Sequence, residues 1–380
     1  MANTSYDLAN PKRDVQEAFD MLVVSRPNFL SLIPRGANAT QTKVEWYEDS
    51  MTPLSTTIGS FDSNNGSGTG INVASTTGMV AGQLLRFESS TGADHGEIVR
   101  IVSVDSSTDL TVTRGVGGTD TTALTCAHTV FRVSTPKNEG TSASAGATRE
   151  GTLNYNYTQI FDRTAKLSKT ALQNATYGAT NQMSYQIAKE LIEINYELNA
   201  ALIYGEREER TSSIEGAMGG IMSFLRGGNV DTTGSAISKT IINNMFKLIF
   251  DDGAGLGNYA ILCNANQAQK ISAFNTSGTN PIVSIPQGST VTGGSISTFI
   301  SDLPSMNGFT ARVVVDPMFP KDKVALIDLN HLEFAYLRPF TTTIAHLPSD
   351  DFEAQRILGE LTLRMKNGTK AHALATGLTV

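Results

Sequence analysis

The stretch Asn181–Gly205, "NQMSYQIAKELIEINYELNAALIYG", carries the strongest helical pattern of the chain. Its glutamates fall on the faces away from the apolar side chains, and Thr180 precedes it as the expected N-cap residue. At 1.5 Å per residue the helix is on the order of 35 Å long, so we expect a spine that supports other segments. The apolar side chains recur at steps of three and four residues, at Met183, Ile187, Leu191, Ile194, Leu198 and Leu202.

A cluster of charged residues follows this helix directly. Glu206–Arg210 reads "EREER", and glycines flank it on both sides. Clustered acids serve acid–base catalysis in some enzymes, but charge clusters at loop entries are usually solvated or paired. We interpret the cluster as contacts with neighbouring loops or subunits, made by Glu206, Arg207, Glu208, Glu209 and Arg210. The glycines are interpreted as hinges that turn the chain into the next segment, at Gly205, Gly216, Gly219 and Gly220.

The size and charge of the chain limit its class of function. Its 380 residues are enough for two or three domains, and a hydrophobic content of 40% predicts an ordered globular protein. The net charge of −7 argues against a dedicated nucleic-acid binder, which would carry a basic face. Cys126 and Cys263 lie in apolar runs, which predicts buried, reduced thiols. No run of apolar residues approaches the length of a membrane span.

The segments before the spine helix predict a hairpin with a module at its tip. Residues 42–51, "TKVEWYEDSM", and the stretch from Leu153 alternate like strands, with Val44 and Trp46 on one side. Flexible Gly/Ser-rich linkers at 59–70 and 136–151 bound the region between them, which is typical of a domain inserted at an exposed loop. Five short strand patterns in that region predict a small barrel or sandwich, at residues 71–76, 83–90, 97–105, 109–115 and 128–134.

The segments after the spine helix complete an α+β pattern. Residues 237–320 alternate helical and strand patterns, including a capped amphipathic helix that starts at Ser238 and a buried strand at 258–264. The tail from Lys323 returns to strand patterns, in which Leu361, Leu363 and Met365 alternate with polar residues.

No catalytic motif has the spacing that its chemistry needs. "DDGAGLG" (251–257) contains G-x-G, but it follows a predicted helix, whereas a phosphate-binding loop precedes one. The five histidines are scattered without metal-binding spacing. Asp251/Asp252 and Asp350/Asp351 are candidate acid–base pairs, yet adjacent acids in a strand point to opposite faces. We therefore predict a protein that is not an enzyme, with no catalytic, cofactor-binding or metal-binding residues.

Several stretches resemble the major capsid proteins of tailed bacteriophages, whose fold encapsulins share. They are "VEWYED" (44–49), "NYTQIFDRTAKLSKTALQ" (156–173), "YGEREERTSSIEGAMGGIMSFL" (204–225) and the tail 334–378 with "TLRMKNGTKAHA", so the resemblance covers most of the chain outside 60–135. It implies an α+β capsid fold that carries an inserted all-β barrel or sandwich. The implied parts are an N-terminal arm (1–36), an extended β-hairpin loop (37–59 and 136–178), the inserted β-domain (60–135), the spine helix of the peripheral domain (179–214), an α/β axial domain (215–320) and the C-terminal β part of the peripheral domain (321–380).

The resemblance also implies a function in assembly. The chain would form hexamers and pentamers of an icosahedral or prolate head that encloses double-stranded DNA without sequence-specific binding. Its implied place is the virion, after assembly in the bacterial host cytoplasm, and its implied partners are other copies, a portal protein and separate scaffolding and decoration proteins, with no membrane. Trp46 and Glu206–Arg210 are the predicted intersubunit contacts. Two alternatives stay open: an encapsulin-like compartment shell, and a carbohydrate-binding protein that uses the β module.

Overall fold

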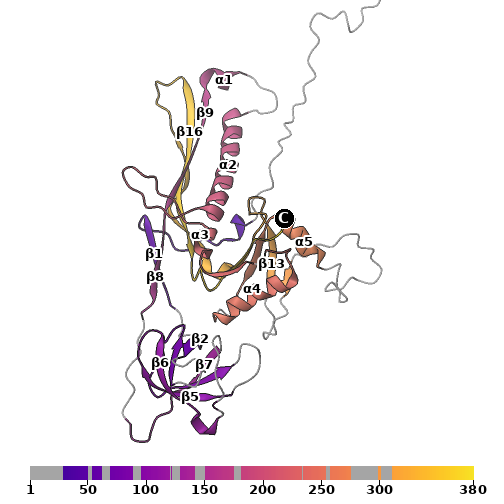
Figure 1. The fold of residues 1–380 in the computed structure, drawn as a ribbon. Coiled ribbons are helices and arrows are strands. Elements are labelled where there is room, and N and C mark those ends of the chain that lie inside the picture. Colours follow the sequence, from indigo (N-terminus) through magenta and orange to yellow (C-terminus); the bar gives the residue numbers. More distant parts are fainter. Residues whose placement is uncertain are drawn as a thin grey trace, which may run out of the picture. The chain divides into compact units, whose positions relative to one another are not determined.

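The computed structural model divides into two compact units (Figure 1). Met1–Glu48 and Leu153–Val380 form one unit, and Asp49–Thr152 form the other. The helices and sheets confirm the α+β fold class. Residues 1–28 of the implied N-terminal arm and parts of both predicted linkers lie outside the described residues. The structure describes residues 29–49, 54–61, 69–88, 96–119, 121, 129–141, 150–174, 181–232, 234–253, 257–274, 298–300 and 310–380.

The unit Asp49–Thr152 contains a closed barrel of six antiparallel strands in the order β2-β3-β6-β5-β4-β7. Alternate side chains fill its interior; in β5, for example, Val99 and Ile101 are 0% and 1% exposed. The strands are β2 (Ser55–Phe61), β3 (Gly70–Val73), β4 (Leu84–Glu88), β5 (Ile98–Val104), β6 (Asp109–Thr113) and β7 (Thr129–Ser134).

Strand β2 corrects the predicted start of the first linker. The sequence predicts a linker from Gly59, whereas β2 continues through Gly59 to Phe61. It does so because Ile58 packs into the barrel core at 3% exposure, while neighbouring residues of β2 pair with β3 and β7. The Gly/Ser composition of 59–70 therefore conceals the end of one strand and the beginning of another.

A long three-stranded antiparallel sheet, ordered β15-β16-β9, forms the first layer of the other unit. Its strands are β9 (Gln159–Ser168), β15 (Leu332–Ile344) and β16 (Phe352–Met365). The register of β15 shifts on both sides of Arg338, next to Pro339, which has no N–H to donate and is tolerated because β15 is an edge strand. The ring of Phe340 covers Gly359, where a Cβ atom would overlap it.

The spine helix α2 (Gln182–Tyr204) lies beside β9 and β16 (Figure 1). Its N-cap is Asn181, whose side chain accepts the Ser184 N–H at 3.1 Å, rather than the predicted Thr180. Leu202 is fully buried in the core, whereas Leu191 is 42% exposed although it belongs to the predicted apolar stripe. The core therefore covers the C-terminal half of the helix more completely than its middle.

A group of exposed ion pairs connects α2 to strand β9 of the sheet. The Arg163 guanidinium of β9 lies 2.9 Å from the Glu193 carboxylate and 3.3 Å from that of Glu197. These side chains are between 38% and 50% exposed, so we expect only modest stabilisation from each pair.

A separate two-stranded sheet joins β1 (Lys43–Glu48) to β8 (Thr152–Tyr157), as the alternation of both segments predicts. Val44 and Trp46 lie on the buried side at 6% and 8% exposure. Tyr47 points the other way and is 79% exposed.

A six-stranded mixed sheet, ordered β10-β17-β14-β11-β13-β12, forms the rest of this unit. Strand β11 is buried on both faces: Ile261 packs in one core with helix α4, and Leu262 packs in another with α2. Figure 1 shows α4 and α5 beside β13. The strands are β10 (Asn229–Thr232), β11 (Tyr259–Cys263), β12 (Thr298–Ile300), β13 (Thr310–Val315), β14 (Val324–Asp328) and β17 (Ala373–Thr376). The helices are α1 (Lys169–Gln173), α3 (Ile221–Leu225), α4 (Lys239–Asp251) and α5 (Ala265–Ala273), with short 3₁₀ turns at Leu30–Leu32, Val116–Gly118 and Leu329–His331.

The six-stranded sheet also takes up part of the C-terminal tail. The resemblance implies that 321–380 belong to the peripheral domain, but β14 pairs with β11 and β17 pairs with both β10 and β14. All five residues of β14 are buried, which suits a strand in the middle of a sheet covered on both faces. Strands β15 and β16 of the same tail do belong to the long sheet.

Candidate functional site around the charged cluster

The charged cluster Glu206–Arg210 begins where α2 ends. Gly205 is the C-cap residue, and its N–H donates to the Ala201 carbonyl at 2.8 Å. The Tyr204 hydroxyl, one residue earlier, donates to the Met318 carbonyl at 2.7 Å. The chain therefore leaves the helix at a fixed point, and the charged side chains start from a defined position.

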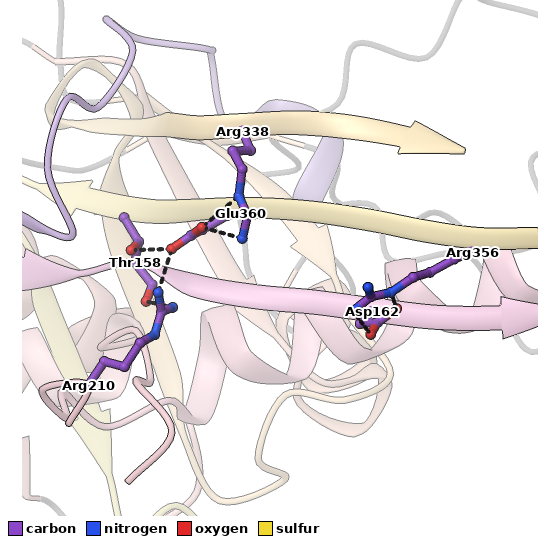
Figure 2. Close-up of polar contacts among 6 residues, drawn as sticks. All are labelled: Thr158, Asp162, Arg210, Arg338, Arg356 and Glu360. Atoms are coloured by element: carbon purple, nitrogen blue, oxygen red, sulfur yellow. Dashed lines mark hydrogen bonds and ion pairs between the residues drawn. The ribbon is translucent and has the colours of Figure 1, made fainter. Parts of the chain in front are cut away.

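Arg210 reaches a buried carboxylate on the long sheet. Its Nη1 atom donates to Glu360 Oε1 at 3.1 Å. The Thr158 hydroxyl donates to the same oxygen at 2.8 Å, and Arg338 Nε donates to Oε2 at 2.9 Å. Figure 2 shows the four side chains converging from β15, β16, the β8–β9 connection and the loop after α2. We call this group the Glu360 junction.

Glu360 is charged although it is only 2% exposed. Burial alone would raise the pKa of its carboxyl group, but hydrogen bonds from Thr158, Arg338 and Arg210 outweigh burial and lower it. Figure 2 also shows a contrasting pair, Arg356 and Asp162, which bridges β16 and β9 while both side chains stay more than a third exposed. Breaking a buried ion pair is costly because it leaves a buried charge without its partner, whereas an exposed ion pair contributes little to the stability of the fold.

The other cluster residues also have partners in the same chain. The Arg207 guanidinium lies 5.0 Å from the Tyr155 ring centroid and 5.1 Å from that of Phe224, which is a cation–π geometry. Glu206 forms an ion pair with Arg226.

Glu208 and Glu209 extend the same set of contacts. Glu208 exchanges two backbone hydrogen bonds of 3.1 Å with Ala217. Glu209 accepts from the Tyr157 hydroxyl at 3.4 Å. The structure thus brings the five predicted charged residues together with β8, α3 and the long sheet of their own subunit, and their contacts with other subunits stay a prediction.

The predicted hinge glycines sit where neighbouring atoms leave little room for a Cβ atom. A Cβ atom on Gly220 would lie 2.6 Å from the carbonyl oxygens of Ala201 and Leu202, and one on Gly205 would overlap Ala201 and Met218 carbonyls. None of the four predicted hinge glycines has a positive φ. Close packing therefore explains these glycines: Gly205 and Gly220 lie against the end of α2, while Gly216 and Gly219 lie against the side chains of Arg210 and Arg207. A hinge motion stays a prediction.

Asn156 is a site residue that the sequence analysis misses. Its side chain is fully buried and accepts the Gly219 N–H at 2.7 Å, while its Nδ2 donates to the carbonyls of Gly219 and Leu363. One amide thus joins β8, the glycine loop and β16. Its partners are 63 and 207 positions away, so no local pattern could indicate them.

Trp46 contributes to the core of its own subunit. Its indole Nε1 donates to Glu48 Oε1 at 2.8 Å, and its ring centroid lies 6.0 Å from that of Phe224. With 8% of its surface exposed, Trp46 offers little area to a neighbour, and its predicted intersubunit contact stays a prediction. Tyr47, on the opposite face of the same strand, offers far more.

A buried histidine, His372, directly precedes strand β17 of the six-stranded sheet. His372 is fully buried; its Nδ1 accepts the Asp328 N–H at 3.1 Å and its Nε2 faces the Lys366 carbonyl at 3.2 Å. Burial lowers the pKa of His372 to about 4. Asp328 in turn lies 2.7 Å from the His331 ring, a contact that helps to hold the pKa of Asp328 below its usual value against burial.

The described residues offer no obvious reactive centre. Burial raises the pKa of the Cys263 thiol to about 12, which leaves it protonated and inert. Within the parts of the chain that the structure describes, no group of three or more His, Cys, Asp or Glu side chains is arranged to hold a metal ion. No described helix has the length and apolar character needed to cross a membrane.

The fold is similar to that of phage capsid subunits. The cyanophage A-1(L) capsid asymmetric unit matches with a TM-score of 0.56 at 12% identity, covering 99% of each chain. The capsid of the native GTA particle matches with a TM-score of 0.52 at 10% identity, covering 99% of this chain and 98% of the other. Mycobacterium phage Cain gives 0.50 at 10% identity, with 100% and 98% covered. These likenesses show that the chain has the fold found in these capsid subunits.

The family can be stated directly. The chain belongs to the SU10 major capsid protein family, whose model matches residues 1–379. No curated protein sequence matches the chain. Its role is structural, as a subunit of a bacteriophage capsid, and the family points to a non-enzymatic function.

Proposed function

We propose that this chain assembles into hexamers and pentamers that close an icosahedral or prolate head around the double-stranded DNA of a phage. The family match over residues 1–379 is the observation that carries the proposal. Copies of the chain are its main partners. A portal protein, separate scaffolding and decoration proteins, and assembly in the cytoplasm of a bacterial host complete the proposal.

The β1–β8 ribbon supports a role in contacts between subunits. An isolated two-stranded sheet is marginally stable in water. Tyr47 on β1 is 79% exposed and Leu153 on β8 is 46% exposed, which leaves apolar surface for a neighbouring copy to cover. We assign the ribbon to the extended loop that lies over a neighbouring subunit.

The Glu360 junction has a supporting task in this function. It ties the base of the extended loop at Thr158, the loop after the spine helix at Arg210 and the long sheet at Glu360 into one rigid body. A shell subunit passes load between its neighbours, so a rigid connection between these segments keeps the surfaces that neighbours bind in fixed relation. The junction thus acts within the subunit and supports contacts made elsewhere.

Negative-stain electron microscopy of the purified chain tests the proposal. We expect closed shells, tubes or rings of capsomers, either from the chain expressed alone or from the chain co-expressed with a scaffolding protein. Analytical ultracentrifugation over a hundredfold range of concentration provides the second measurement. A chain that stays monomeric across that range under both conditions would contradict the proposed function.

The two alternatives have less support. An encapsulin-like shell uses the same fold, but the family match is to a major capsid protein. A carbohydrate-binding barrel would need aromatic rings on its surface, and Phe87 lies in the barrel core at 0% exposure.

A further inference from the structure

The outer half of strand β15 is an open sheet edge. The three-stranded sheet is ordered β15-β16-β9, so among the strands that the structure describes β15 pairs with β16 alone in this sheet. The residues Thr341–Ile344 are exposed, and Ile344 reaches 73%. Open edges present unpaired N–H and C=O groups, which bind other strands readily.

The inner half of the same edge already binds an extended segment. The Phe334 N–H donates to Pro34 O at 2.9 Å, and the Gly36 N–H donates to Phe334 O at 2.8 Å. The Ala39 N–H continues this pairing on Tyr336 O at 2.9 Å. The edge of β15 is therefore suited to strand addition, and the two register shifts around Arg338 end the occupied half.

The register of β15 on β16 shows which groups face the open side. Ala345 donates its N–H to Ala354 on the β16 side at 2.9 Å, and Thr343 and Thr341 follow in the same register. Because alternate residues of an antiparallel strand bond to opposite sides, Thr342 and Ile344 direct their N–H and C=O groups to the open edge. Among the described residues, no backbone group bonds to them there.

The stretch Phe340–His346, "FTTTIAH", has no Lys, Arg, Asp or Glu. Natural proteins protect open edges with charges, prolines or bulges. Here Pro339 and the bulges protect the middle of β15, while the β-branched outer half is left unprotected. An unprotected neutral edge is suited to pairing with a strand that is also neutral.

We propose that this edge pairs with the same edge of a second copy of the chain around a twofold axis. Symmetric antiparallel pairing would bond Thr342 to Ile344 of the second copy and place the two Thr343 side chains next to each other at the axis. The neutral stretch brings no like charges together there. Arg338, whose side chain is 49% exposed, precedes the stretch Phe340–His346, and Asp350 and Asp351 follow it. Antiparallel pairing would therefore set Arg338 of each copy near Asp350 and Asp351 of the other.

The contact rests on the shell proposed above, because a patch of this size is too small to hold a dimer alone. It gains effect when other contacts of the lattice already hold the two copies together. We therefore expect the pairing in assembled particles and not in dilute unassembled subunits.

Cysteine cross-linking in assembled particles tests the register. In a non-hydrogen-bonded antiparallel pair the Cα atoms are about 4.5 Å apart, within the range of a disulfide. Particles of Thr343→Cys, treated with diamide, should give a dimer band on a non-reducing gel. Thr341→Cys is the matched control: the two copies of residue 341 would lie about 13 Å apart along the strands, too far for a disulfide. Wild-type particles show the background from Cys126 and Cys263.

The outcomes separate the contact from the function. Normal particles in which Thr343→Cys gives no dimer band, or gives no more than Thr341→Cys, would overturn the proposed pairing and leave the capsid role intact. Failure of the wild-type chain to form any particle would instead count against the capsid role. A charge test is independent of cross-linking: Thr343→Lys or Thr343→Glu alone should lower the particle yield, and mixing the two variants should restore it. Equal yields from single and mixed variants would also overturn the pairing.

Discussion

Acidification provides the sharpest test of the energetics, through His372. The side chain is fully buried and neutral, and its pKa is lowered from 6.5 to about 4. The unfolded chain therefore binds a proton at higher pH than the folded chain. Stability from this group is fully present above pH 6.5 and is lost as the pH falls from 6.5 towards 4. The loss should reach about 2 kcal/mol at pH 5 and about 3 kcal/mol below pH 4.

The assay is urea unfolding of the unassembled subunit at intervals between pH 8 and pH 4.5, for the wild type and for His372→Asn. The variant keeps an acceptor near the position of Nδ1, which faces the Asp328 N–H, and removes the titrating group. We expect it to be about 1 kcal/mol less stable at pH 8, through the lost contact with Lys366, but less sensitive to acid. The same pH dependence in both proteins would refute the assignment of acid sensitivity to His372.

Three further predictions concern the site and the barrel. Glu360→Gln should lower the free energy of unfolding by about 2 kcal/mol, because it removes the charge from a buried hydrogen-bonded carboxylate, whereas the exposed Asp162→Asn should cost less than about 1 kcal/mol; equal losses would contradict the role of burial. Gly220→Ala should cost about 2 kcal/mol or more, measured as a lowered melting temperature, because its Cβ would overlap backbone carbonyls of α2; an unchanged melting temperature would refute the close packing. Replacing 55–134 with a short Gly/Ser linker should leave a folded subunit by circular dichroism, because the barrel has its own core; global unfolding would contradict the independence of the two units.

The helical spine and the alternating strands were predictable because their patterns are local. The apolar steps from Met183 to Leu202 mark α2, and Val44 and Trp46 share a buried face as alternation requires. The pattern could not show how far the core extends along the helix, so Leu191 is exposed although it lies on the predicted stripe.

The partners of the charged residues could not be predicted because they are distant in the chain. Arg210 and Glu360 are separated by 150 positions, and nothing near Arg210 indicates that its partner lies on β16. For the same reason the sequence could not reveal which contacts Glu206–Arg210 make within their own subunit, and their contacts with other subunits stay a prediction. Trp46 lies on the buried side of β1, and large aromatic residues fill cores as readily as interfaces, so its residue type alone could not place it.

The ends of the barrel have a practical consequence. Strand β2 begins and strand β7 ends side by side, with Ser55 paired to Phe131. The chain therefore enters and leaves the barrel at one place, and the flanking strands β1 and β8 are themselves paired. A folded module whose termini lie equally close could replace the barrel without stretching either strand. The position between β1 and β8 is thus a natural cassette site, at which evolution can exchange whole domains and at which a foreign protein can be displayed once per subunit.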